Sequence, residues 1–177
     1  MRVLGAVLAG GRSSRFGSDK ALAVWRGKPL LAHAADALVA QCGAVVIVGR
    51  DVAGFTCVPD WPAPDRGPLG GLAGALNHAL TNGYELVLTC GVDSVGLPAD
   101  LLRQLQPAPA FVVTQPVLGL WPAEAAGLVE EILFGGGSHS MRAFADRIGA
   151  RPVKLAAEPA NVNAPEDLAR LELHHGL

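Results

Sequence analysis

The sequence predicts a single α/β domain of three layers, in which a mostly parallel sheet is covered by helices on both faces. Short β-branched runs alternate along the chain with Ala- and Leu-rich segments of helical period. The β-branched runs are almost continuously apolar, as expected for strands that are buried on both faces. With 177 residues, 50% of them hydrophobic and 17% charged, the chain can bury one core.

The individual elements follow from this alternation. Strands are expected at residues 3–8, 44–48, 55–58, 86–89 and 111–114. Helices are expected at residues 29–41, 69–80, 98–105, 124–133, 140–148 and 165–173. Proline lies in the first turn of three of these helices, where its missing N–H costs nothing: Pro29, Pro98 and Pro165. Asn163 is expected to cap the last helix, whose first turn carries Glu166 and Asp167.

Charge, hydropathy and cysteine spacing exclude several classes of protein. The net charge of −2 gives no electrostatic reason to expect a nucleic-acid partner. No apolar run reaches the roughly 20 residues that are needed to cross a membrane. The three cysteines, Cys42, Cys57 and Cys90, show no CxxC spacing, which argues against a disulfide framework or a zinc site. We therefore expect a cytoplasmic enzyme.

The loop after the first strand has the composition of a phosphate-binding loop. Residues 8–20 read LAGGRSSRFGSDK, and adjacent glycines let backbone N–H groups approach an anion. The backbone expected to do so belongs to four residues: Leu8, Ala9, Gly10 and Gly11. Three cations follow, enough to hold a triphosphate: Arg12, Arg15 and Lys20. The spacing is neither GxxxxGK(S/T) nor GxGxxG, so an ordinary surface loop rich in Gly and Arg is the alternative.

This loop resembles the signature of the nucleotidyltransferases that use a Rossmann-like fold, LAGGxSxRMGxDK in its usual form. Gly10 and Gly11 followed by Asp19 and Lys20 make it most similar to the molybdenum cofactor guanylyltransferases. The cytidylyltransferase relatives tend to carry LAAG and lack the Asp before Lys. The resemblance implies that Arg15 and Lys20 hold the triphosphate and belong to the catalytic residues.

A second segment resembles the part of this family that lies beside the nucleotide base. Residues 67–72 read GPLGGL, similar to the family's GPLAGL, which opens a helix at the base-binding pocket; Gly67 is therefore a candidate nucleotide contact. The spacing from Asp60 to Gly67 also matches, and the resemblance implies that Asp60 contacts guanine. A carboxylate suits guanine because it accepts both the N1–H and the exocyclic N2–H. Asp65 lies nearer the helix start and is a competitor for that role.

A third segment suits a magnesium ion. The strand at 86–89 leads into residues 90–98, CGVDSVGLP, which resemble the family's CDxPxLP although Val92 and Val95 depart from it. Mg²⁺ is usually held by one or two carboxylates together with substrate phosphates and water, and Asp93 lies just past a strand end that faces the phosphate loop. Asp93 is expected to bind Mg²⁺, to contact the nucleotide and to take part in catalysis. The alternative is a carboxylate that only caps a turn.

The C-terminal half resembles the acceptor-binding half of the family less closely. Gln115 opens a segment similar to the family's HPxxALY strand and stands where His is common. Residues 135–142 resemble a Gly/Arg/Ser segment, with His139 where Arg is frequent. Residues 161–168, NVNAPEDL, are similar to NVNTPEDL, which implies that Asn161 and Asn163 bind the acceptor. We therefore expect a nucleotide-binding part at about 1–106 and an acceptor-binding part at about 107–177.

The reaction implied by the resemblance is transfer of GMP from GTP to the terminal phosphate of molybdopterin, with release of pyrophosphate. The expected partners are GTP, molybdopterin or Mo-molybdopterin, and a transient cofactor-delivery protein. The acceptor phosphate is already anionic, so alignment and charge neutralisation suffice without a strong general base. Two alternatives stay open: a related nucleotidyltransferase with another nucleotide or acceptor, of the cytidylyl or sugar-phosphate type, and a nucleotide-binding module without catalysis.

Overall fold

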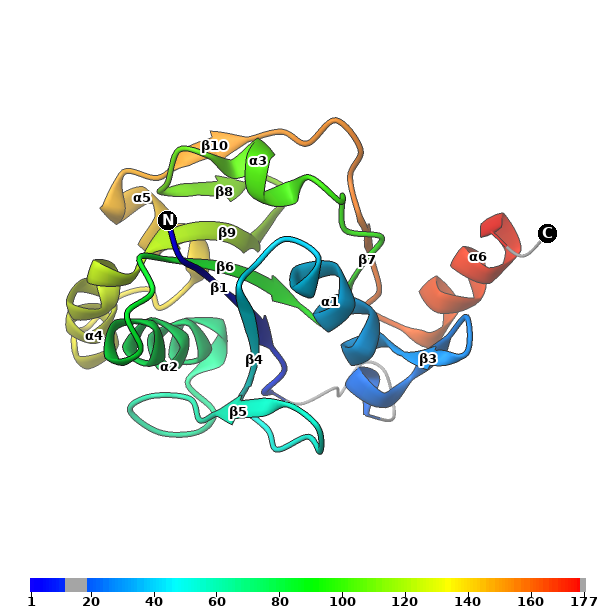
Figure 1. Cartoon of the computed structure of the whole chain (residues 1–177), viewed down its shortest axis with the longest axis horizontal. Coiled ribbons are helices and arrows are strands. Elements are labelled where there is room, and N and C mark those ends of the chain that lie inside the picture. The colour runs from blue at the N-terminus through cyan, green and yellow to red at the C-terminus, as the bar shows by residue number, and fades with distance from the viewer. Residues whose placement is uncertain (12–18, 176–177) are drawn as a thin grey trace.

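A seven-stranded sheet forms the centre of the molecule in the computed structural model, which describes residues 1–11 and 19–175 (Figure 1). From one edge to the other, the strands are β10 (Arg151–Val153), β8 (Ala110–Val112), β9 (Gln115–Pro122), β6 (Leu86–Gly91), β1 (Val3–Leu8), β4 (Ala44–Val48) and β5 (Thr56–Val58). The strands predicted from the sequence are all present, with ends that move by one or two residues. The sequence pattern missed β10, which is only three residues long, and β9, which only the family resemblance had indicated.

The sheet is mostly parallel, as predicted. β1 pairs in parallel with both β4 and β6, β4 with β5, and β8 with β10, whereas β9 runs antiparallel to β6 and to β8. Leu8 lies opposite Val48 on one side and Gly91 on the other. The carboxyl ends of three neighbouring strands are thus level, and the loops that follow them meet at one edge of the sheet.

Helices cover both faces of the sheet, which confirms the three-layer prediction (Figure 1). On β1, Leu4 and Ala6 belong to one buried cluster while Val3 and Val7 belong to the other, as the alternation of a strand requires. The first cluster includes residues of α2 (Gly67–Thr81), α4 (Ala126–Phe134) and α5 (Met141–Ile148). The second includes residues of α1 (Leu30–Val39) and α3 (Leu101–Leu105). A short 3₁₀ turn, η2 (Ala123–Ala125), leads into α4.

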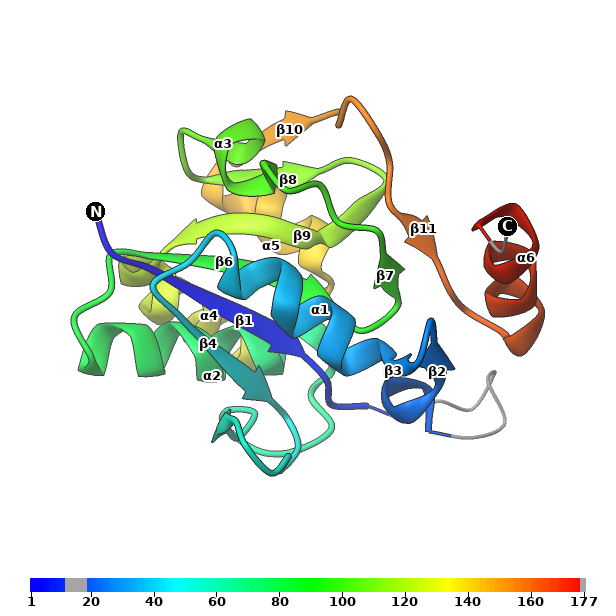
Figure 2. The same cartoon turned by 45° about the vertical axis from the view of Figure 1, so that its right-hand side comes forward.

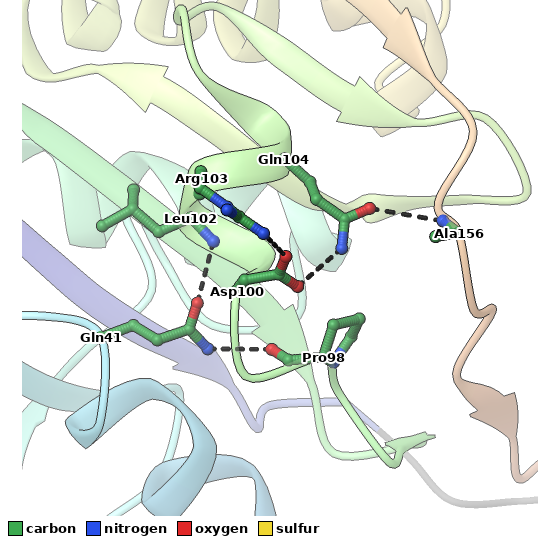
Figure 3. Close-up of polar contacts among 7 residues, drawn as sticks. All are labelled: Gln41, Pro98, Asp100, Leu102, Arg103, Gln104 and Ala156. Atoms are coloured by element: carbon green, nitrogen blue, oxygen red, sulfur yellow. Dashed lines mark hydrogen bonds and ion pairs between the residues drawn. The ribbon is translucent and has the colours of Figure 1, made fainter.

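The third helix is shorter than the predicted 98–105, because side chains hold the preceding turn in another conformation. The amide of Gln41, after α1, donates to the carbonyl of Pro98 over 3.1 Å and accepts from the N–H of Leu102 over 2.9 Å (Figure 3). The helix therefore starts at Leu101. On the same helix, Gln104 donates to Asp100 over 2.7 Å and accepts from the N–H of Ala156 over 3.3 Å, which ties α3 to a distant segment.

Two small ladders lie beyond the central sheet. β2 (Val24–Trp25) and β3 (Lys28–Pro29) form a hairpin, and β7 (Ser94–Val95) pairs antiparallel with β11 (Ala160–Asn161) (Figure 2). The last helix, α6 (Pro165–His175), lies near the hairpin, where Leu168 and Leu171 pack against a cluster that contains Trp25. In the parts of the chain that the structure describes, no helix combines the length and apolarity of a membrane span.

The prediction that Asn163 caps α6 is wrong. Among the described residues, its side chain does not cap the helix; instead, a side chain in the first turn of the helix accepts from the N–H of Asn163. Residue Ala164, not Asn163, directly precedes the helix. The carboxylate of Asp167 accepts from the N–H of Asn163 over 2.9 Å and from the N–H of Ala164 over 3.0 Å. A carboxylate in the first turn thus accepts hydrogen bonds from the backbone N–H groups that precede the helix. The third helical residue does the same in a capping box. These bonds also lower the pKa of the Asp167 carboxyl.

Candidate functional site

A cavity of about 320 Å³ opens where the level ends of β1, β4 and β6 meet. This is the edge at which open α/β sheets usually bind ligands. Nine of the ten predicted nucleotide-contacting residues line it: Leu8, Ala9, Gly10, Gly11, Lys20, Asp60, Asp65, Gly67 and Asp93. The tenth, Arg15, lies outside the described residues, as does Arg12.

Two glycines bring the first loop against the end of β4. Gly49 has φ of +91°, and a Cβ there would lie 2.7 Å from the Cα of Gly10 and 2.9 Å from Oδ1 of Asp60. A Cβ on Gly10 would lie 3.4 Å from Oδ2 of the same carboxylate. At position 49, only glycine lets the two turns approach this closely. The carboxylate of Asp60 therefore lies directly against the start of the predicted phosphate loop.

Asp60 is half-buried and receives no hydrogen bond from the described residues. Burial raises the pKa of its carboxyl, and the negative charge of Asp65 raises it further. A ligand with N–H donors would supply the interactions that the carboxylate lacks. Asp65 lines the same cavity but is exposed, in a turn with φ of +61° that Asp tolerates. Both candidates for contact with the base thus face one space.

Helix α2 begins at the same cavity. Gly67 and Pro68 line the cavity wall, and the side chain of the N-cap residue, Arg66, makes no capping hydrogen bond to the helix. The helix packs closely against the loop that contains Pro59 because residue 74 is glycine: a Cβ there would lie 2.2 Å from the carbonyl oxygen of Pro59. This contact places the loop that carries Asp60 against the body of α2.

The opposite wall carries a cation and a carboxylate. Nζ of Lys20 lies 3.9 Å from Oδ2 of Asp93, and the two side chains are 17% and 31% exposed. The backbone carbonyl of Asp93 accepts from the N–H of Val162 over 2.8 Å. Its Oδ1 would be 2.6 Å from a Cβ on Gly91, so the side chain folds back over a glycine at the end of β6.

This donor set suits a magnesium ion that shares its ligands with a substrate. Of the carboxylates that line the cavity, Asp93 is the one that forms an ion pair with Lys20 among the described residues. Over residues 1–11 and 19–175, no three His, Cys, Asp or Glu side chains are grouped to enclose a metal. Mg²⁺ commonly keeps several waters and takes phosphate oxygens together with one or two carboxylates. The residues present therefore fit a nucleotide-bound ion better than a closed metal site.

The predicted acceptor residues lie beside this wall without lining the cavity. Asn161 lies opposite Ser94 in the β7–β11 ladder, one residue from Asp93. Asn163 lies two residues further on, and both asparagines are exposed. The structure thus brings Asn161 near the carboxylate, and contact of either asparagine with an acceptor stays a prediction.

Gln115, the residue that departs from the family's His, ties three segments together. The hydroxyl of Ser94 donates to Oε1 of Gln115 over 2.6 Å, and Nε2 of Gln115 donates to the carbonyl of Pro159 over 2.9 Å. Both ends of the amide are therefore engaged at the start of β9. His139 is partly buried in the loop between α4 and α5, where its ring contacts the carbonyl of Gly135 over 3.1 Å.

Sequence reasoning missed Arg50. It follows β4 by two residues and lines a second cavity, of about 390 Å³, that shares Gly10, Gly11, Asp60 and Asp65 with the first. Its guanidinium makes two bonds to Asp19, of 3.1 and 2.5 Å. This ion pair lowers the pKa of Asp19. A cation just beyond the carboxyl end of a parallel strand was the available signal.

Comparison with known proteins gives this site a family. A family model described as a MobA-like NTP transferase domain matches residues 5–149. The molybdenum cofactor guanylyltransferase of Acidiphilium cryptum is 34% identical over 180 residues, which cover 94% of this chain and 92% of that protein.

Solved structures share the fold. Molybdopterin-guanine dinucleotide biosynthesis protein A from Archaeoglobus fulgidus superposes with a TM-score of 0.74 at 19% identity, covering 98% of each chain. Rv0371c from Mycobacterium tuberculosis, solved in complex with manganese, gives 0.64 at 17% identity, covering 97% of this chain and 98% of that one. The extent of the family match and the identity to a curated relative are decisive: the chain belongs to the molybdenum cofactor guanylyltransferases, within the MobA-like NTP transferase domain family.

Proposed function

We propose that this protein transfers GMP from GTP to the terminal phosphate of molybdopterin and releases pyrophosphate. One observation carries the proposal: a single cavity joins the glycine backbone after β1, the half-buried carboxylate of Asp60, and the Lys20–Asp93 pair. These are the groups needed for phosphates, for the donor edge of guanine and for a metal ion, respectively. The names of the curated relatives support the same reaction.

Each group has a distinct task in nucleotide binding. The N–H groups around Gly10 and Gly11 approach the phosphates, because no Cβ stands between them and the cavity. Lys20 and Arg15 neutralise the triphosphate. Asp60 accepts hydrogen bonds from guanine, which explains why a half-buried carboxylate is tolerated without a donor from residues 1–11 or 19–175. Asp65 competes for the same role from the rim of the cavity.

Asp93 would hold Mg²⁺. When bound, the ion would neutralise charge on the phosphates and so favour attack by an anionic acceptor. The chain's own residues would do the rest by alignment: Lys20 would orient the phosphates, and the side chain of Asp93 lies beside Lys20, folded back over Gly91. The attacking phosphate is already an anion, so no residue has to remove a proton from it.

The acceptor would bind on the side formed by residues of about 107–177, with Asn161 and Asn163 among its contacts. Its entry beside Asp93 is supported by the β7–β11 ladder, which adjoins the carboxylate. Molybdopterin, with or without molybdenum, would be handed over by a transient delivery protein. We place the reaction in the cytoplasm, which fits the unpaired thiols of Cys42, Cys57 and Cys90.

The test is acceptor-dependent release of pyrophosphate. The protein is incubated with Mg²⁺, molybdopterin and each nucleoside triphosphate in turn, with omission of molybdopterin as the control. The proposal predicts release with GTP and little with CTP, ATP or UTP. A preference for CTP would contradict the guanylyl assignment. Tight GTP binding without release for any acceptor would favour a nucleotide-binding module.

A further inference from the structure

An ion pair fastens the far end of the predicted phosphate loop to the sheet. Arg50 comes from the turn after β4, and Asp19 directly precedes the 3₁₀ turn η1 (Lys20–Leu22). The two guanidinium nitrogens Nη1 and Nη2 each reach a different oxygen of the carboxylate. Such a two-point contact fixes orientation as well as distance, which a lysine ammonium would not do.

Asp19 performs a second task with the same carboxylate. Its Oδ1 accepts from the N–H of Ala21 over 3.2 Å and so caps η1. Lys20 is the first residue of this turn. When Arg50 holds the carboxylate and the carboxylate holds the turn, the backbone of Lys20 has little freedom to rotate.

The fixed turn aims Lys20 across the cavity at Asp93. A continuous series of contacts therefore runs from the end of β4, through Arg50 and Asp19, to Lys20, and then to the carboxylate that follows β6. The Arg50 and Asp19 side chains are 28% and 38% exposed, so the pair is shielded from solvent more than the Lys28–Asp36 pair, at 56% and 59%. Partial burial makes such a contact worth more than a fully solvated one.

We propose that Arg50 is a positioning residue, which acts on the nucleotide through Asp19 and Lys20 and does not contact it directly. The inference rests on the proposed function in one respect, that the cavity lined by Lys20 and Asp93 holds the triphosphate. It gives a role to the Asp that precedes Lys in the loop, and it adds a residue from a different strand to the phosphate-binding apparatus.

The experiment is a set of double-mutant cycles on the dissociation constant of the nucleotide in the presence of Mg²⁺. The variants are R50M, D19N, K20A, R50M/D19N and R50M/K20A, each with its Tm. We expect R50M and D19N each to weaken GTP binding about fivefold to tenfold, as for a partly exposed charged pair. The R50M/D19N protein should bind no more weakly than the weaker single variant. In the K20A background, R50M should change binding less than about twofold.

The matched control is R103M, which breaks another Arg–Asp pair, the one with Asp100 on α3 (Figure 3). Its dissociation constant should equal that of the wild type. R50K keeps the positive charge but not the two-point contact of the guanidinium. Its affinity for GTP should therefore lie between those of R50M and the wild type. It is carried through the same cycles, so the conclusion does not depend on R50M remaining folded at the assay temperature.

Two results would overturn the inference. If R50M weakens GTP binding by the same factor in the K20A background as in the wild type, Arg50 contacts the nucleotide itself. If R50M and R50K bind GTP as the wild type does, Arg50 has no role in binding. The proposed function fails differently, by a preference for another nucleoside triphosphate; the same cycles are then measured with that nucleotide.

Discussion

The two sides of the candidate site are built in different ways. The nucleotide side stands on three adjacent parallel strands whose ends are level, and its shape depends on glycines that allow backbones to touch. The acceptor side depends on a ladder of two-residue strands, β7 and β11, held by the amide of Gln115. The first side is therefore preformed by the core. The second depends on a few polar contacts, and we expect it to be the easier one to alter selectively.

The largest effects should follow from removing the charged pair that the two sides share. Lys20→Ala and Asp93→Asn should each lower turnover at least about a hundredfold, because each removes a group that aligns or neutralises the transferring phosphate. Pyrophosphate release under saturating substrate measures this. The control pair is Lys28→Ala and Asp36→Asn, each of which disrupts an exposed Lys–Asp contact between β3 and α1. Near-normal turnover in either site variant would remove that residue from the mechanism.

Asp60 should show a conflict between stability and binding. Its raised folded pKa means that the unliganded folded protein holds this proton more tightly than the unfolded chain does. Stability therefore falls as pH rises from the usual value of 3.8 through the raised one. Asp60→Asn should raise Tm at neutral pH and leave Tm unchanged below pH 3.8, where the wild-type carboxyl is protonated in both states. It should also weaken GTP binding about tenfold or more.

Titrations of GTP binding and thermal unfolding across pH would check this. Wild-type GTP binding should weaken in acid as the carboxylate takes up its proton, whereas the Asn variant should lack that dependence. A lower Tm for the Asn variant at neutral pH would show that Asp60 has a stabilising partner in the free protein, contrary to the account.

Helix α2 offers a steric test of the preformed side. Gly74→Ala places a methyl group against the carbonyl of Pro59, next to Asp60, and should cost about 1–3 kcal/mol of unfolding free energy. Gly127→Ala on α4 is the matched control, because nothing lies within 4 Å of its Cβ. It should be neutral or slightly stabilising. Chemical denaturation measures both, and equal stability of the two variants would refute the proposed close contact.

The smallest and most selective effect should come from the acceptor side. Gln115→Leu removes both polar contacts and should raise KM for molybdopterin about threefold to tenfold, while the dissociation constant of GTP stays unchanged. Thr114→Val, which removes an exposed contact with Glu158, serves as the control and should alter neither. Weaker GTP binding by the Leu variant would mean that the contacts of Gln115 with Ser94 and Pro159 support the nucleotide side as well.

The same difference explains what could be predicted from the sequence. The cavity residues follow strand ends directly, so local patterns placed Gly10, Asp60 and Asp93 at one edge. The contact between Arg50 and Asp19 could not be predicted, because the two residues are 31 positions apart and their contact depends on the order of strands in the sheet. Gln115 was noted only because it stands where the family commonly has His, whereas its bonds to Ser94 and Pro159 depend on long-range pairing.

The most direct test of the account is a crystal structure of the protein with GTP and Mn²⁺, in which anomalous scattering locates the metal. We expect a metal peak bonded to Asp93, phosphates against the backbone of Gly10 and Gly11, and guanine hydrogen-bonded to Asp60 or Asp65. A nucleotide bound away from this cavity, or a metal that does not contact Asp93, would contradict it.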